Sequence, residues 1–382
     1  MSTAPPGAAA RLAPPDVLTS AAARWRVERA WPRPDRTVLV EVVDEEHGQL
    51  TGGRWVPHGV DVPASPAGLT VPADGGTAVL HPGGDDPRLP RLADDLVAGG
   101  RLLGHRVGRR AVVARPDGSY AKHVRARSVP AVVGGLEAAA AALAGLAAPT
   151  RLRTVEVARV RTVEAGSVVV LEPLAGMSLL ELGRRADDAV VLAAWRATAE
   201  LLAALQAGDP GSATWSSQQE ESATRRLVEP AVAAGLLDAG AVELVEQVAG
   251  RLHRLGAPDR VVPLHRDLHD QQVLVDAEAG RAPRLGLLDC DTAVAGDPAL
   301  DPGNLLAHLR LRVLQGLLRP DRAATAAAAL GAVTGGSGEE SLRLHQRLTL
   351  LRLAGLYVWR PRWRHLGPAL LAAAREEAPT PA

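Results

Sequence analysis

The chain has very little of several residue types, and each scarcity excludes a class of protein. It has one cysteine, Cys290, so it cannot form an internal disulfide framework, and this is typical of a reducing compartment. Aromatic residues make up 2% of the chain and the formal net charge is +0, so the composition offers nucleic acid neither stacking platforms nor electrostatic attraction. We therefore expect a cytoplasmic protein with no nucleic-acid partner.

Long hydrophobic runs are also missing. Arg, Asp, Glu or Gly interrupts every Leu, Val and Ala stretch before it reaches the roughly 20 residues that a membrane span needs. The first residues lack the basic and apolar segments of a signal peptide. No membrane association is expected.

Lysine is nearly absent. The chain has no Phe and no Ile, its only asparagine is Asn304, and only one of its 43 Lys+Arg residues is a lysine, Lys122. This pattern suggests a coding bias toward GC-rich codons. A lysine that persists at one position against such a bias indicates a role that a wide guanidinium does not fill.

What is present is a sheet-rich part followed by a helix-rich part. We expect a disordered leader at 1–23, a small β-rich cap module at 24–90, a β-rich lobe at 91–175, a helical lobe at 176–376 and a tail at 377–382. The β-rich lobe contains a hairpin around the turn signal Pro-Asp-Gly and a helix at 132–146. The main helices of the second lobe are expected at 189–206, 218–234, 239–255, 304–318 and 339–358.

The strongest chemical signal is a polar loop between two short apolar strands, followed by a second acidic turn. The loop reads LHRDLHDQQVLV and contains Asp267, and the turn reads LLDCDTAVAGDPALD and contains Asp289. Phosphoryl transfer needs a group that accepts the proton of the substrate hydroxyl and oxygen ligands that hold Mg²⁺ on the phosphates. Asp267 and Asp289 can supply these two functions.

These pieces, in this order, resemble the aminoglycoside phosphotransferase family, whose loops read His-Gly-Asp-x-His-x-x-Asn and Gly-Asp-Pro-x-x-Asp. The resemblance covers residues 101–308 and implies an α+β, bilobal protein-kinase-like fold that uses ATP and Mg²⁺. It makes Asp267 the catalytic base, Asp289 a metal ligand and Asp301 the carboxylate that braces the catalytic loop. It also assigns His265 to the catalytic group and His269 to structural support.

Two positions depart from the family pattern. Arg266 stands where the family has Gly, which gives the His-Arg-Asp of protein kinases; the Gly-Asp-Pro-x-x-Asp element and the absence of an Ala-Pro-Glu segment argue against a protein substrate. Gln272 stands where a metal-binding Asn is expected, and it keeps the amide oxygen one methylene further out. Maltokinase-type sugar kinases are similar here, with Gln before Val-Leu.

The resemblance also assigns the nucleotide site. Lys122 looks like the lysine that contacts the α- and β-phosphates, and Glu137 on the following helix is the candidate that orients it; the alternative is that Glu137 is an exposed helix carboxylate. VVVLEPLAG resembles the hinge between the lobes, where adenine pairs with the carbonyl of Glu172 and the N–H of Leu174. Gly104 belongs to a short phosphate loop.

The last helices contain many arginines, interleaved with Tyr357, Trp359 and Trp363: Arg343, Arg347, Arg352, Arg360, Arg362 and Arg364. If these arginines face the acceptor pocket they repel a polycation, which favours a neutral or anionic metabolite, with a sugar as one candidate. The alternative is a solvated face.

The sequence therefore predicts an ATP- and Mg²⁺-dependent phosphotransferase that acts on a hydroxyl group of a small molecule. The cap module is loosely similar to the one that precedes the kinase lobes of maltokinases, so a maltokinase-like sugar kinase is one alternative. A nucleotide-binding pseudokinase that acts as a scaffold is the other.

Overall fold

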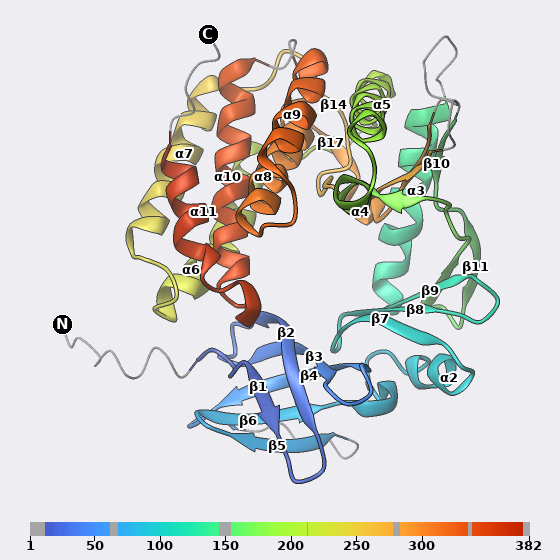
Figure 1. The fold of residues 1–382 in the computed structure, drawn as a ribbon, viewed down its shortest axis with the longest axis vertical. Coiled ribbons are helices and arrows are strands. Elements are labelled where there is room, and N and C mark those ends of the chain that lie inside the picture. Colours follow the sequence, from blue (N-terminus) through green and yellow to red (C-terminus); the bar gives the residue numbers. More distant parts are fainter. Residues whose placement is uncertain are drawn as a thin grey trace.

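The computed structural model describes residues 12–61, 68–144, 154–211, 213–277, 283–334 and 338–376. Figure 1 shows the cap module at the bottom, with the sheet of the β-rich N-lobe above it on the right and most of the helical C-lobe above it on the left. The cap lies below both lobes. The predicted tail at 377–382 lies outside the described residues.

The cap module is a six-stranded sheet with the strand order β1-β2-β3-β4-β6-β5. Its strands are β1 (Val17–Thr19), β2 (Arg24–Pro32), β3 (Val38–Asp44), β4 (Leu50–Pro57), β5 (Leu69–Ala73) and β6 (Gly76–Leu80). All its neighbouring strands pair antiparallel. Strand β1 lies inside the range predicted to be a disordered leader; it is ordered because it pairs with β2 and buries Leu18.

The N-lobe contains a five-stranded sheet with the order β11-β12-β9-β8-β7. The short helix α2 (Leu92–Val97) leads into the strands β7 (Arg101–Arg106), β8 (Arg110–Ala114), β9 (Tyr120–Val124), β11 (Val160–Glu164) and β12 (Val168–Leu171). Helix α3 (Val129–Ala144) follows β9, close to the predicted 132–146. Strand β10 (Thr154–Val157), in contrast, leaves the predicted N-lobe and pairs with β16 (Arg284–Leu287) in the C-lobe.

The C-lobe begins with β13 (Met177–Ser178) and is mostly helical. The predicted helices correspond to α5 (Asp188–Ala207), α6 (Ser217–Ala233), α7 (Gly240–Leu255), α8 (Leu300–Leu314) and α10 (Glu339–Tyr357). Three further helices, α4 (Leu179–Arg185), α9 (Pro320–Thr334) and α11 (Leu366–Arg375), had not been predicted. The strands β14 (Val262–Leu264), β15 (Val273–Asp276) and β17 (Val294–Gly296) flank the two acidic loops.

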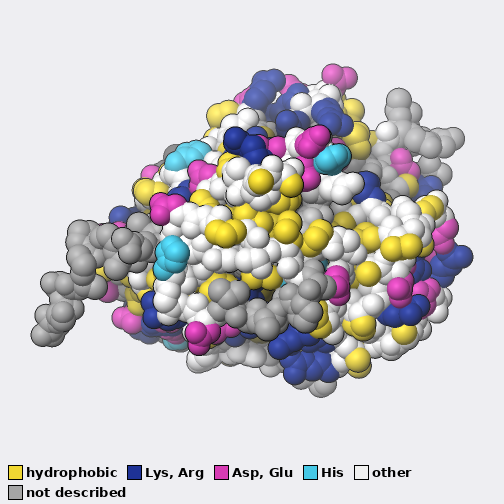
Figure 2. Space-filling model, turned by 90° about the horizontal axis from the view of Figure 1, so that it is seen from below, with side chains coloured by type: hydrophobic (Ala, Val, Ile, Leu, Met, Phe, Trp, Pro, Cys, Tyr) yellow, Lys and Arg dark blue, Asp and Glu magenta, His cyan; other side chains and the backbone are white. Residues whose placement is uncertain are grey.

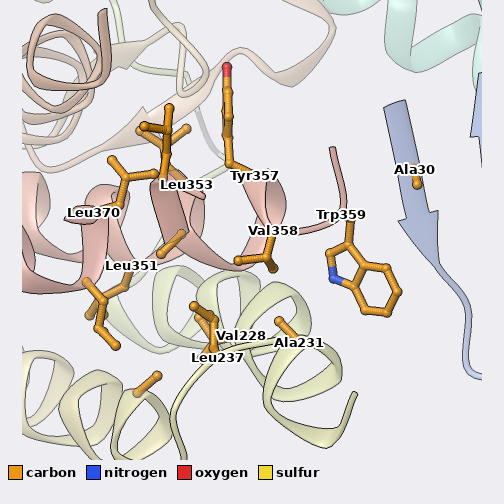
Figure 3. Packing of buried hydrophobic residues seen from close by; sticks show 14 of the residues in the cluster. Ala30, Val228, Ala231, Leu237, Leu351, Leu353, Tyr357, Val358, Trp359 and Leu370 are labelled. Atoms are coloured by element: carbon orange, nitrogen blue, oxygen red, sulfur yellow. The ribbon is translucent and has the colours of Figure 1, made fainter. Parts of the chain in front are cut away.

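One hydrophobic core joins the cap module to the C-lobe. It contains Trp25 and Trp55 from the cap sheet together with buried residues of α6, α7, α8, α10 and α11. Figure 3 shows Trp359, just after α10, lying between the helices and Ala30 on β2.

From below, Lys and Arg side chains alternate with acidic and apolar ones, so this face has no single sign of charge (Figure 2).

One stretch of the described residues, Ala126–Ala144, is long and apolar enough by composition to cross a membrane. Most of it is helix α3, which buries Val132, Leu136 and Leu143 in the core that it shares with α5.

Candidate active site

Lys122 on β9 reaches across to the C-lobe and binds two aspartates. Its Nζ lies 2.7 Å from Oδ1 of Asp289 and 2.5 Å from Oδ2 of Asp291. Lys122 is only 3% exposed, so the two carboxylates supply the charge compensation that a buried ammonium needs. The lone lysine and the second acidic turn, 167 residues apart in the chain, therefore form one cluster.

Glu137 is not part of this cluster. Helix α3 approaches the acidic turn through Gly135, where an added Cβ would lie 2.2 Å from the carbonyl oxygen of Cys290. Two residues further along a helix corresponds to about 200° of rotation, so Glu137 lies on the opposite, exposed face. The second carboxylate partner of Lys122 is therefore Asp291, which the sequence analysis had not assigned to it.

Gln272 lies beside Asp289. Its side-chain nitrogen is 3.4 Å from Oδ2 of Asp289, and a side-chain amide can turn either its oxygen or its nitrogen toward a neighbour. Burial alone would raise the pKa of Asp289, but the charges of Lys122 and Arg110 outweigh it and lower that pKa to about 2. A permanently ionised carboxylate next to an amide fits the oxygen ligands that Mg²⁺ prefers.

The catalytic loop is held by Asp301 in the first turn of α8. The Asp301 carboxylate accepts the N–H of His265 at 2.7 Å and the N–H of Arg266 at 2.8 Å. Arg266 adopts a φ of 70°, a left-handed conformation that explains why related loops use glycine at this position. Its guanidinium stacks over Trp215 at 4.2 Å. Asp267 follows directly and is exposed, with no hydrogen bond within the described residues.

His265 and His269 stabilise the loop that contains Asp267. His265 Nε2 lies 2.6 Å from the carbonyl oxygen of Leu288, which connects the loop that contains Asp267 to the acidic turn that contains Asp289. His269 stacks on His308 with ring centroids 4.6 Å apart, and burial lowers the pKa of both imidazoles. Both rings are therefore neutral at pH 7.

Two residues that the sequence analysis had not singled out for the loop also hold it. The side-chain nitrogen of Asn304 donates to the carbonyl of Leu268 at 2.7 Å, and Arg312 binds Asp270 through two bonds of 2.8 and 2.9 Å. His269, Asp270 and His308 lie close enough together to hold a metal ion, but Arg312 already occupies both oxygens of Asp270. Asn304 is the single asparagine of the chain, and this was the sequence signal that could have pointed to its role in the loop.

Gly104, which was predicted to belong to a short phosphate loop, does not lie in the turn between β7 and β8. Gly104 lies within β7 and faces the cap module, where its Cβ would lie 3.5 Å from Oε2 of Glu41. The turn between β7 and β8 instead contains Gly108, with a φ of 62°, whose N–H donates to Asp86. Glu172 and Leu174 follow β12 and line a cavity of about 470 Å³ with the end of α3 and with β10.

The comparisons with known proteins agree with this geometry. A family model described as the phosphotransferase enzyme family matches residues 102–345, well over half of the chain. The chain belongs to this family. It is therefore a small-molecule phosphotransferase, and the cap module lies entirely outside the matched range.

Solved structures show the same kinase-like fold. The GDP and kanamycin complex of an aminoglycoside 2″-phosphotransferase aligns with a TM-score of 0.51 and 16% identity, covering 72% of this chain and 92% of that one. The GDP complex of an aminoglycoside 2′-phosphotransferase variant aligns with a TM-score of 0.50 and 16% identity, covering 72% and 91%. A search of the curated proteins gives no match.

In this phosphotransferase, Asp267 opens into a cavity of about 940 Å³. Its lining comes from the cap module, the β7–β8 turn, α6, α10 and the loop that contains Thr292. Of the late arginines that were predicted either to face the acceptor or to be solvated, only Arg352 lines the cavity. Arg343 pairs with Glu339, and Arg360 and Arg362 stack on aromatic rings of their own segment.

Proposed function

We propose that this protein transfers the γ-phosphoryl group of ATP, in the presence of Mg²⁺, to a hydroxyl group of a small molecule. The observation that carries the proposal is the cluster of Lys122, Asp289 and Gln272, together with an exposed Asp267 that lines a large cavity. The cluster provides phosphate neutralisation, metal ligands and a base, which are the parts that phosphoryl transfer needs.

Asp267 accepts the proton of the acceptor hydroxyl while the oxygen of that hydroxyl forms a bond to the γ-phosphorus. The bond between that phosphorus and the β–γ bridging oxygen breaks, and ADP leaves with the electron pair. Lys122 neutralises negative charge on the α- and β-phosphates, and Asp291 and Asp289 orient its ammonium. Asp289 and Gln272 would hold Mg²⁺, which supplies further charge neutralisation on the phosphates.

The surrounding residues position these groups. Asp301 fixes the backbone on the N-terminal side of Asp267, and His265 connects it to the metal loop. The Glu172 carbonyl and the Leu174 N–H are placed after β12, where they are available to pair with adenine. Each of these contacts reduces the freedom of the reacting groups before substrate binds.

The test is the substitution Asp267→Asn. Asp267 is exposed and makes no hydrogen bond within the described residues, so the change removes the base without disturbing the fold. We expect turnover to fall ~100-fold or more while the Kd for Mg²⁺–ATP changes little. Phosphate transfer from labelled ATP across a panel of sugars, including maltose, and amino alcohols measures it, with Asp321→Asn on the surface of α9 as the control.

The same panel separates the alternatives. Turnover that survives Asp267→Asn within a few-fold removes Asp267 from the mechanism. Intact nucleotide binding with no turnover of any acceptor favours the scaffold, and maltose as the preferred acceptor favours the sugar kinase.

A further inference from the structure

The cavity in front of Asp267 is built by three parts of the chain. The cap module contributes Trp31 and Arg33, the β7–β8 hairpin contributes Arg106, and α6 contributes Arg226. Because Asp267 also lines this cavity, a molecule bound here presents its hydroxyl to the catalytic loop. The cavity is therefore the acceptor site of the proposed reaction, and the cap module is one of its walls.

The lining of this cavity has an excess of positive charge. Its charged residues are Arg33, Arg106, Arg109, Arg226, Arg266 and Arg352 against Glu220, Glu229 and Asp267. Two of the three carboxylates already have partners: Glu220 binds Arg352 at 2.6 Å, and Glu229 lies 3.3 Å from Arg225. A cleft lined by one sign of charge attracts ligands of the opposite sign.

Arg106 shows the imbalance most clearly. Its guanidinium stacks over Trp31 at 5.1 Å, and its Nε is buried with no hydrogen-bond partner within the described part of the chain. Burial and the neighbouring charges of Arg109, Arg110 and Arg33 lower the pKa of Arg106 to about 10. Crowded like charges without a counterion are unfavourable, and an anion in the cavity relieves that repulsion.

Arg33 and Arg226 approach the cavity from elements that do not form the nucleotide site. Arg33 follows β2 in the cap module, and Arg226 lies on the exposed face of α6. Neither makes an ion pair within the described residues. Arg110, in contrast, acts on Asp289 and so belongs to the phosphate-donor side.

We propose that the acceptor is an anionic hydroxy compound, such as a sugar acid or a sugar phosphate, whose carboxylate or phosphate binds Arg33, Arg106 and Arg226 while its hydroxyl faces Asp267. The proposal rests on the phosphotransferase function above. Arginine suits this role because its planar fork binds carboxylate and phosphate through paired hydrogen bonds. The same arginines repel polycationic acceptors.

The first experiment compares acceptors of matched size with the full chain, Mg²⁺ and labelled ATP. The panel contains a hexose, the corresponding uronic acid, the hexose phosphate and the polycation kanamycin. We expect an anionic member to have a kcat/KM at least ~100-fold above the neutral hexose, with two charge-assisted contacts each contributing about tenfold. Preference for the acid or the phosphate distinguishes the two sources of negative charge.

The second experiment measures anion binding without turnover, by calorimetry with a non-hydrolysable ATP analogue present. Arg33→Ala, Arg106→Gln and Arg226→Ala should each weaken binding of the preferred anion about tenfold and leave the Kd of the nucleotide analogue unchanged. Arg185→Ala is the matched control, because Arg185 is 67% exposed on α4 and outside the cavity. Binding of that anion should also weaken as salt is raised.

The outcomes separate the two proposals. Equal turnover of the neutral hexose, or anion binding that is unaffected in all three variants, overturns the anionic acceptor and leaves the phosphotransferase function intact. Anion binding that depends on these arginines, with no transfer to any acceptor, supports the site and contradicts the proposed function.

Discussion

In the described part of the chain, the ammonium of Lys122 pairs with two carboxylates, both from the acidic turn after β16. Asp289 and Asp291 hold the ammonium of Lys122 between them, while Glu137 on α3 faces solvent. The buried charge is therefore compensated within a single turn of the C-lobe, and the N-lobe is tied directly to the metal loop. This arrangement gives Asp291 a role that its position two residues after Asp289 did not reveal.

Asp291→Asn tests that role. The amide keeps the size of the side chain but removes one of the two negative charges around Lys122, so the ammonium loses orientation on the phosphates. We expect kcat/KM for ATP to fall about tenfold, which corresponds to the roughly 1.4 kcal/mol of one charge-assisted hydrogen bond.

Glu137→Gln is the matched control, because it removes an equivalent charge from the exposed face of α3. Steady-state kinetics with varied ATP measures both variants. A loss of ATP specificity in Glu137→Gln that matched the loss in Asp291→Asn would contradict the assignment.

At the scale of elements, α8 positions the catalytic loop. Its first two turns carry Asp301 and Asn304, which bind three backbone groups of the loop between β14 and β15. Arg312 further along the same helix binds Asp270. The loop keeps Arg266 in a left-handed conformation because these bonds outweigh the local cost, roughly 1 to 2 kcal/mol for a residue with a Cβ.

The conformation of Arg266 predicts an unusual order of stability. Both Arg266→Gly and Arg266→Ala lose the stacking on Trp215, but only glycine adopts a φ of 70° without strain. We expect Arg266→Ala to have a free energy of unfolding about 1 kcal/mol below that of Arg266→Gly. Chemical denaturation followed by circular dichroism measures both.

The control pair is placed at Arg196, an exposed position in the interior of α5, where the helical conformation reverses the order. There the alanine variant should be about 1 kcal/mol more stable than the glycine variant. If alanine were also the more stable residue at position 266, the left-handed conformation would be excluded.

At the scale of the whole molecule, the cap module is a structural bridge between the two lobes. It shares a hydrophobic core with α6, α10 and α11, and it contacts β7 through Gly52 and Glu41. The N–H of His105 on β7 donates to buried Glu41 at 2.9 Å. The relative placement of the lobes, and with it the shape of the cavity in front of Asp267, therefore depends on how the cap is docked.

Gly52→Ala tests this docking. An added Cβ would lie 2.4 Å from Nδ1 of His105 and 2.9 Å from its carbonyl oxygen, so β4 and β7 must move apart. We expect a loss of about 1 to 3 kcal/mol in the free energy of unfolding and a raised KM for the acceptor with an unchanged Kd for nucleotide.

Gly134→Ala in α3 is the control for Gly52→Ala, because nothing lies within 4 Å of its added Cβ. That variant should be more stable by roughly 1 kcal/mol. Equal effects of the two substitutions would show that β4 and β7 are not in close contact.

The sequence alone was enough to predict the family, the fold and the class of enzyme. The family model and the solved structures confirm the predicted family, the bilobal α+β fold and the class of enzyme. These features were predictable because they follow from short motifs whose residues act together within a few positions. The solitary Lys122 and the acidic turn around Asp289 were singled out in the same way, and the structure brings them together. The site roles themselves, and the use of ATP and Mg²⁺, stay predictions that the experiments above test.

Only the tertiary structure decided which carboxylate faces Lys122, where β10 pairs, and which arginines line the cavity in front of Asp267. The close approach of Gly135 to Cys290 fixes the rotation of α3 and turns Glu137 outward, and no local pattern encodes that rotation. The arginines of the cavity come from the cap, the β7–β8 hairpin and α6, far apart in the chain. Their shared environment arises from packing between elements, which periodicity and motif spacing do not specify.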